Sequence, residues 1–153
     1  MTPLLHALLV LVHLAGVIVW VGGMVFAQFA LRPAAVRLLE PPVRLPLMAL
    51  ALGRFFHLVA VAVVAILLTG GALLTNVGMA QAPPAWHVML TVGVVMAGIF
   101  AFIYFRLFPA LREAVAGGQW PVAAAVLNRI RGLILVNLGL GGVAVAAAVL
   151  ARV

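Results

Sequence analysis

Hydrophobic residues fill four long stretches of this chain, and short segments rich in proline, glycine and arginine separate them. The stretches run approximately over residues 4–31, 47–76, 86–108 and 122–151. Each holds at least the roughly 20 mostly apolar residues that a helix needs to cross a bilayer. The pattern therefore predicts an all-α fold with four transmembrane helices, the last of which enters the membrane after Arg131.

Proline and glycine mark the predicted connections between these helices. We expect the first helix to end at Arg32-Pro33, because proline lacks an amide hydrogen and clashes with the preceding turn. Three further prolines should keep the chain non-helical before the second helix, namely Pro41, Pro42 and Pro46. The later helices are separated by Pro83-Pro84 and by Gly117-Gly118.

The composition places the chain in one class. Of its 153 residues, 68% are hydrophobic and 7% are charged, a balance that no soluble domain of this size can accommodate. We therefore expect one integral membrane domain over residues 1–153, a polytopic four-transmembrane-helix bundle whose solvent is the lipid bilayer. The chain has no cysteine, which excludes disulfides and thiolate metal sites.

The arginines predict how the chain is oriented. They account for the formal net charge of +7 and stand at the ends of apolar stretches, which indicates membrane topology rather than nucleic-acid binding. The connection after the first helix and the region around the start of the fourth are rich in arginine, whereas residues 76–86 carry no charge. The positive-inside rule places the arginine-rich connections in the cytoplasm and both termini in the periplasm.

Two histidines occupy matching positions in two halves of the chain. His13 precedes Arg32 by nineteen positions, His87 precedes Arg106 by nineteen, and a Pro-Ala dipeptide follows each arginine. This spacing predicts two parallel helical-hairpin repeats, with both imidazoles at the same depth near the outer face. Because burying an ionisable group in a membrane is costly, the matched pair indicates a transition-metal centre or a haem.

The first two helices carry further candidate residues. His6, Trp20 and Gly16 lie on or beside the helix face that carries His13. Gly16 would serve either close helix packing or a flat ligand.

His57 and Arg54 lie together on the second helix. Arg54 could bind an anion such as a haem propionate or extend toward the membrane surface. Structural roles for His6 and His57 are alternatives to metal binding.

The opening helix resembles that of the copper resistance protein D (CopD) domain family, in its short four-helix bacterial form. The residues that carry the resemblance are His13-Leu-Ala-Gly16, Trp20-Val-Gly22-Gly23 and Leu31-Arg32-Pro33, with further similarity at Gly53-Arg54-Phe55-Phe56 and in the helix of His87. The resemblance implies a bacterial inner-membrane protein of copper uptake or tolerance, with His13 and His87 as ligands and a periplasmic copper carrier as a partner. A more distant similarity to membrane-type protoporphyrinogen oxidases implies haem b and a quinone.

Three functions stay open at this point. Copper could bind to His13 and His87, with His57 and His6 as further ligands, although cysteine is absent and Met89 and Met96 lie off the face of His87. Haem b could instead have His13 and His87 as axial ligands in a haem-dependent membrane oxidoreductase linked to quinol. The third possibility is a non-catalytic scaffold or subunit, and self-association into a homo-oligomer is compatible with each.

The carboxylates exclude one further class. The chain has only Glu40 and Glu113, both in predicted connections, so a hydrolase or transferase that needs a buried acid–base pair is not expected.

Overall fold

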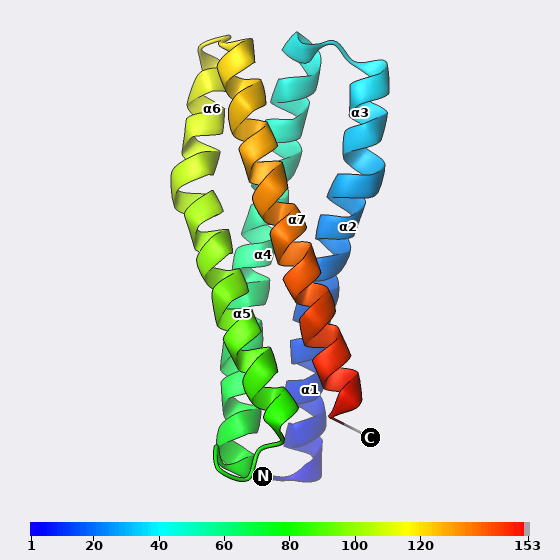
Figure 1. Ribbon diagram of the computed structural model, residues 1–153, viewed down its shortest axis with the longest axis vertical. Helices are drawn as coiled ribbons and strands as arrows, with labels where there is room; N and C mark the ends of the chain where they lie inside the picture. Colours follow the sequence, from blue (N-terminus) through cyan, green and yellow to red (C-terminus); the bar gives the residue numbers. More distant parts are fainter. Residues whose placement is uncertain (152–153) are drawn as a thin grey trace.

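The computed structural model describes residues 1–151, which form four long helical segments joined by short connections (Figure 1). The first segment comprises α1 (Pro3–Val17), α2 (Gly23–Phe26) and α3 (Arg32–Leu38), linked by π-helical turns at Ile18–Gly22 and Ala27–Leu31. The second segment is α4 (Pro41–Val77), the third comprises α5 (Pro84–Phe102), a π-helical turn at Ile103–Leu107 and α6 (Phe108–Ala116), and the fourth is α7 (Trp120–Leu150). All four segments are long and apolar enough to cross a membrane, so the predicted all-α membrane bundle is confirmed.

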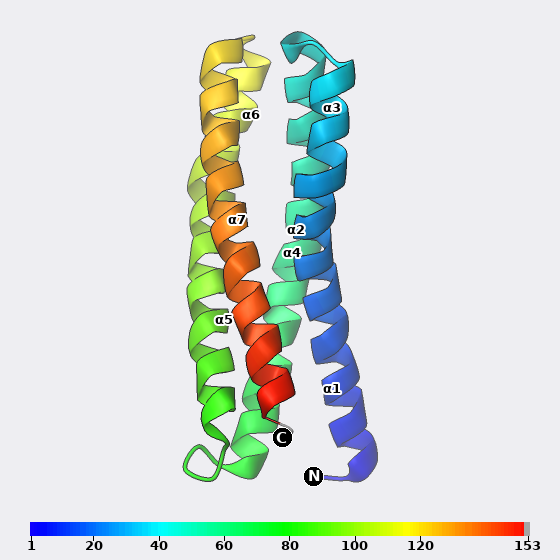
Figure 2. The ribbon, with the colours of Figure 1, turned by 45° about the vertical axis from the view of Figure 1, so that its right-hand side comes forward.

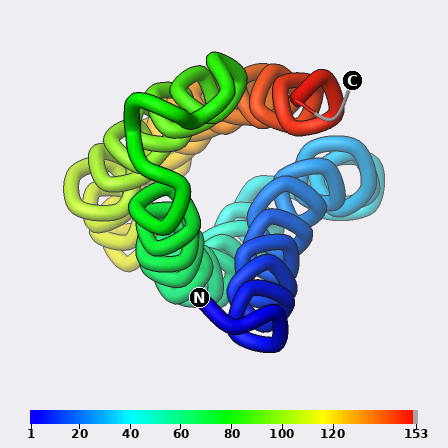
Figure 3. Tube along the Cα trace, turned by 90° about the horizontal axis from the view of Figure 1, so that it is seen from below, coloured from blue at the N-terminus to red at the C-terminus, as the bar shows by residue number. Residues whose placement is uncertain are grey.

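The helices form two hairpins, each made of two antiparallel helical segments, and the hairpins pack against each other. α1 packs mainly on α4, and α5 and α6 pack on α7 (Figure 2). The N-terminus and the end of α7 lie at the same end as the connection between α4 and α5, as the view from that end shows (Figure 3). The core between the hairpins is aromatic and aliphatic, and it includes Trp20, Phe56, Phe100, Leu111 and Ile130.

The first helix does not end at Arg32-Pro33 as expected, but continues to Leu38. The π-helical turn at Ala27–Leu31 ends two residues before this proline. A π turn shifts the backbone hydrogen bonds from the i−4 to the i−5 carbonyl and widens the helix, which makes room for a residue that lacks an amide hydrogen. The second half of the chain has the same arrangement, because the π turn at Ile103–Leu107 ends two residues before Pro109.

The prolines before the second helix lie inside it, contrary to expectation. Pro41 and Pro42 occupy the first two positions of α4, where a backbone amide has no partner within the helix in any case. Pro46 lies in the second turn and removes only the bond that its amide would have made to the carbonyl of Pro42. Proline therefore starts this helix earlier than predicted.

Gly16 permits the close contact of α1 with α4. A β-carbon at this position would lie 2.8 Å from Ile66 Cγ1 and 3.2 Å from the carbonyl oxygen of Ala62. We expect Gly16→Ala to lower the free energy of unfolding by about 1–3 kcal/mol, because the added methyl group forces the two helices apart. Gly22→Ala is the matched control, since a β-carbon at Gly22 meets no atom within 4 Å. Thermal unfolding in detergent measures both, and equal stability of the two variants would contradict this account.

Candidate metal centre

His13 lies between α1 and α4, half-buried, and its ring nitrogen Nδ1 is 3.0 Å from the hydroxyl oxygen of Thr69. That hydroxyl is 2.6 Å from the carbonyl oxygen of Ala65, to which it donates its one hydrogen. The oxygen of Thr69 must then accept a hydrogen from Nδ1 of His13. In the neutral imidazole this leaves Nε2 unprotonated, with a lone pair available to a metal ion.

Gly70 provides the space for this ring. A β-carbon there would lie 3.1 Å from Cε1 and 3.5 Å from Nδ1 of His13. The contact is tighter than most van der Waals contacts, so a larger residue would displace the imidazole from Thr69. The sequence Thr69-Gly70 therefore supplies both a hydrogen-bond acceptor and an open helix surface.

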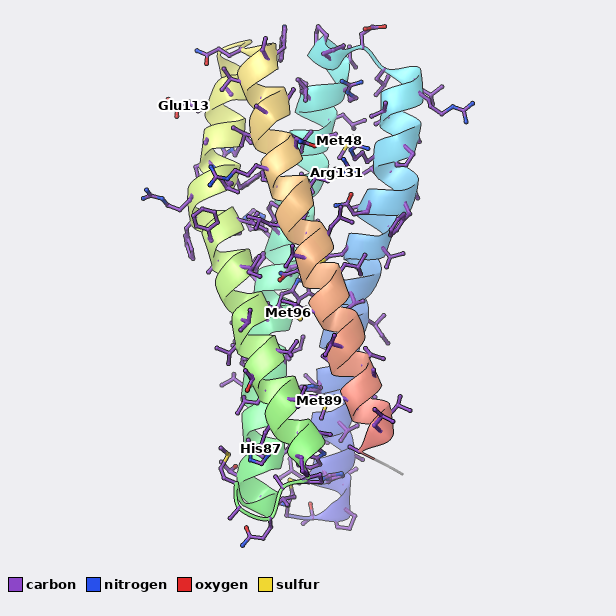
Figure 4. The ribbon with its side chains drawn as sticks, in the orientation of Figure 1. Met48, His87, Met89, Met96, Glu113 and Arg131 are labelled. Carbon is purple, nitrogen blue, oxygen red and sulfur yellow. The ribbon has the colours of Figure 1, made fainter. Side chains whose placement is uncertain are left out.

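His87 lies in the first turn of α5, near the end of the bundle that holds the termini (Figure 4). Its Nδ1 is 3.4 Å from the carbonyl oxygen of Pro83, which can only accept a hydrogen. Nε2 is then again the unprotonated nitrogen. The hydrogen bonds of the two predicted ligands thus run to different partners, but both favour the same tautomer.

His57 and Arg54 lie on α4, far along that helix from Thr69, the residue that contacts His13. Both side chains are exposed, and Nδ1 of His57 donates to the carbonyl oxygen of Gly53 at 2.6 Å. Arg54 is fifteen residues from Thr69 in one continuous helix, which corresponds to about 22 Å at 1.5 Å per residue. A propionate of a haem bound to His13 would not reach that guanidinium.

The other residues predicted for the site have different surroundings. His6 is exposed near the start of α1. Trp20 is 5% exposed in the core and makes an edge-to-face contact with Phe100 at 6.2 Å between ring centroids. Trp20 therefore packs the two hairpins together, as Gly16 packs α1 on α4.

One feature of the site could not be predicted from the sequence. Thr69 was not singled out as the partner of His13, because a threonine in an apolar stretch gives no signal until its neighbour across the interface is known. Three methionines are buried at different levels of the bundle, namely Met24, Met48 and Met96. Figure 4 shows Met89 and Met96 successively farther from His87 along α5, with Met48 nearer the opposite end.

The residues described contain no group of three or more histidine, cysteine, aspartate or glutamate side chains that could hold a metal ion. Imidazole nitrogens are ligands that suit zinc, copper, iron and nickel.

Comparison with protein families assigns the chain. The family model described as copper resistance protein D matches residues 49–151, about two thirds of the sequence. The chain belongs to the copper resistance protein D family. The match runs from within α4 to the end of α7, and so includes His57, Thr69 and His87 of this CopD protein but not the opening helix with His13.

No curated protein and no solved structure matches the chain. The family match confirms the resemblance to CopD, whereas nothing found supports the one to protoporphyrinogen oxidases.

Proposed function

We propose that this CopD protein binds copper through Nε2 of His13 and of His87, in copper uptake or tolerance. The observation that carries the proposal is the chain of hydrogen bonds from His13 Nδ1 to Thr69 and on to the carbonyl of Ala65. A hydrogen bond that fixes one ring nitrogen as the donor is the usual arrangement behind a metal-binding histidine. Membership of a copper-resistance family supports copper as the metal.

The proposal excludes the other two described histidines from the copper site. His57 is twelve residues from Thr69 on α4, or about 18 Å along the helix axis. His6 is exposed, and its imidazole has no hydrogen bond within residues 1–151 that orients the ring. Both can therefore serve as control positions in binding experiments.

The haem b alternative has less support than the copper proposal. Its proposed propionate partner, Arg54, is too far along α4 from the level of His13, and the family match points to copper. The copper proposal also includes the location: the inner membrane, with the copper site toward the periplasm and the arginine-rich connections toward the cytoplasm.

The test is a copper(I) titration of the purified protein in detergent, under ascorbate, with an absorption spectrum of the same sample. We expect one copper ion per chain and no Soret band. His87→Gln should weaken copper binding by at least about tenfold, because it removes one of the two ligands. His57→Gln is the matched control, because that ring also donates to a carbonyl four residues earlier in its helix.

Two outcomes would overturn the proposal. One is a protein that binds no copper(I) in the titration while its thermal unfolding shows that it is folded. The other is a Soret band in the wild-type spectrum that His13→Gln removes, which would assign the histidines to haem instead.

A further inference from the structure

A cavity of about 180 Å³ lies at the end of the bundle opposite to the proposed copper site. Its walls come from the turn at Ala27–Leu31, from α3, from the start of α4 and from α7, and so from both hairpins. It is found where α3 and α7 diverge (Figure 1). The polar groups that line it are those of Gln28, Arg32, Arg44, Asn128 and Arg131.

The three arginines of this cavity differ from the others in the chain. Arg32, Arg44 and Arg131 are half-buried, whereas every other arginine between residues 1 and 151 is exposed. Arg131 Nε is buried and has no hydrogen-bond partner among the described residues. Arg32, Arg44 and Arg131 line the same cavity, so their positive charges repel one another.

No carboxylate compensates this positive charge within the cavity. The only acidic residues of the chain are Glu40 and Glu113, and neither lines it. Figure 4 shows Glu113 on the outer side of α6, turned away from Arg131, which lies between the helices. Gathering three cations in partly buried positions is unfavourable unless an anion joins them.

Gln28 is bonded to the backbone of the helix that carries Arg131. The residue is 8% exposed, and its side-chain amide donates to the backbone carbonyl oxygen of Arg131 at 3.1 Å. This bond joins the first helical segment to α7 across the cavity. The arrangement is thus built from packed residues and is not a chance meeting of exposed side chains.

We propose that this cavity binds a phosphate group, of the kind carried by anionic lipid headgroups and by inorganic phosphate. Guanidinium groups match the oxygens of a phosphate with paired hydrogen bonds, which lysine does not provide. Basic pockets between transmembrane helices at the cytoplasmic surface are a common form of headgroup site. Aliphatic residues such as Leu45 and Ile134 line the remainder, where a glycerol or acyl group would fit. The proposal does not depend on copper binding.

The test uses delipidated full-length protein in a neutral detergent, with ligand binding followed by native mass spectrometry and thermal unfolding. The probes are phosphatidylglycerol, zwitterionic phosphatidylcholine and inorganic phosphate. We expect phosphatidylglycerol or inorganic phosphate to bind and to raise the unfolding temperature, and phosphatidylcholine to do neither. Arg131→Gln should weaken that binding by at least about tenfold, the loss of one charge-assisted contact.

Arg129→Gln is the matched control, because Arg129 is exposed on the same helix two residues away. Arg44→Gln provides a second test if Arg131→Gln does not fold. Response to inorganic phosphate alone would identify a soluble anion, and response to phosphatidylglycerol alone would identify a lipid. Equal affinity of wild type, Arg131→Gln and Arg129→Gln, or no response to either phosphate probe, would overturn the proposal.

Discussion

Thr69→Val is expected to weaken copper binding by about 10- to 100-fold while leaving the helices assembled. Valine has nearly the shape of threonine but offers no acceptor to Nδ1 of His13, which in the wild type donates to the hydroxyl oxygen of Thr69 at 3.0 Å. Without that bond the imidazole can rotate and can carry its hydrogen on Nε2, where it blocks the metal. The affinity for copper(I), measured by competition with a chelator, reports the effect.

Thr75→Val is the matched control for this substitution. Thr75 lies on the same helix, is exposed, and uses its hydroxyl only on the carbonyl of Ala72. Its replacement should leave copper affinity unchanged. His13→Gln sets the upper limit for the loss of copper affinity, since removing the ligand must be at least as damaging as misorienting it. Wild-type affinity in Thr69→Val would show that the hydrogen bond does not prepare His13 for a metal.

Phe56→Ala is expected to cause a large loss of stability. Phe56 is 2% exposed, and its ring packs edge-to-face on Phe108 at 5.3 Å and on Phe100 at 6.1 Å between centroids. Lipid is as apolar as the protein interior, so the loss arises from the cavity and not from transfer to water. Roughly 100 Å³ of unfilled space at about 24 cal/mol per Å³ corresponds to about 2 kcal/mol.

The measurement is unfolding in mixed detergent micelles, compared with Phe29→Ala. Phe29 is 66% exposed, so its removal opens no cavity within the bundle and should change stability little. Phe56 joins α4 to the hairpin of α5, α6 and α7, and its loss should therefore separate the two hairpins. Equal stability of the two variants would mean that the aromatic cluster does not hold the hairpins together.

The helices could be predicted from the sequence more securely than their ends. Apolar stretches of sufficient length become helices in a bilayer because each backbone amide must be satisfied within its own segment. The helix ends were predicted from the positions of proline, and these predictions were wrong at the end of the first helix and at the start of the second. Pro33 is accommodated by a π turn, and Pro46 by its position near the start of a helix, which local sequence does not reveal.

The residues of the candidate site also differ in how far the sequence predicts them. His13 and His87 could be selected from their spacing to arginine, and the similarity to the CopD family extended to residues 49–151. Thr69 and Gly70 could not be selected, because their role depends on α1 packing against α4 with His13 on the contact face.

The sequence by itself determined that this protein is a four-helix membrane bundle with most of its arginines toward one end. Length, hydropathy and charge act along the chain, and they need no knowledge of which helix neighbours which. Only the tertiary structure decided that Thr69 receives a hydrogen from His13, and that Arg32, Arg44 and Arg131 surround one cavity. These contacts join residues from separate helices, and the packing of small and aromatic side chains sets where such helices meet.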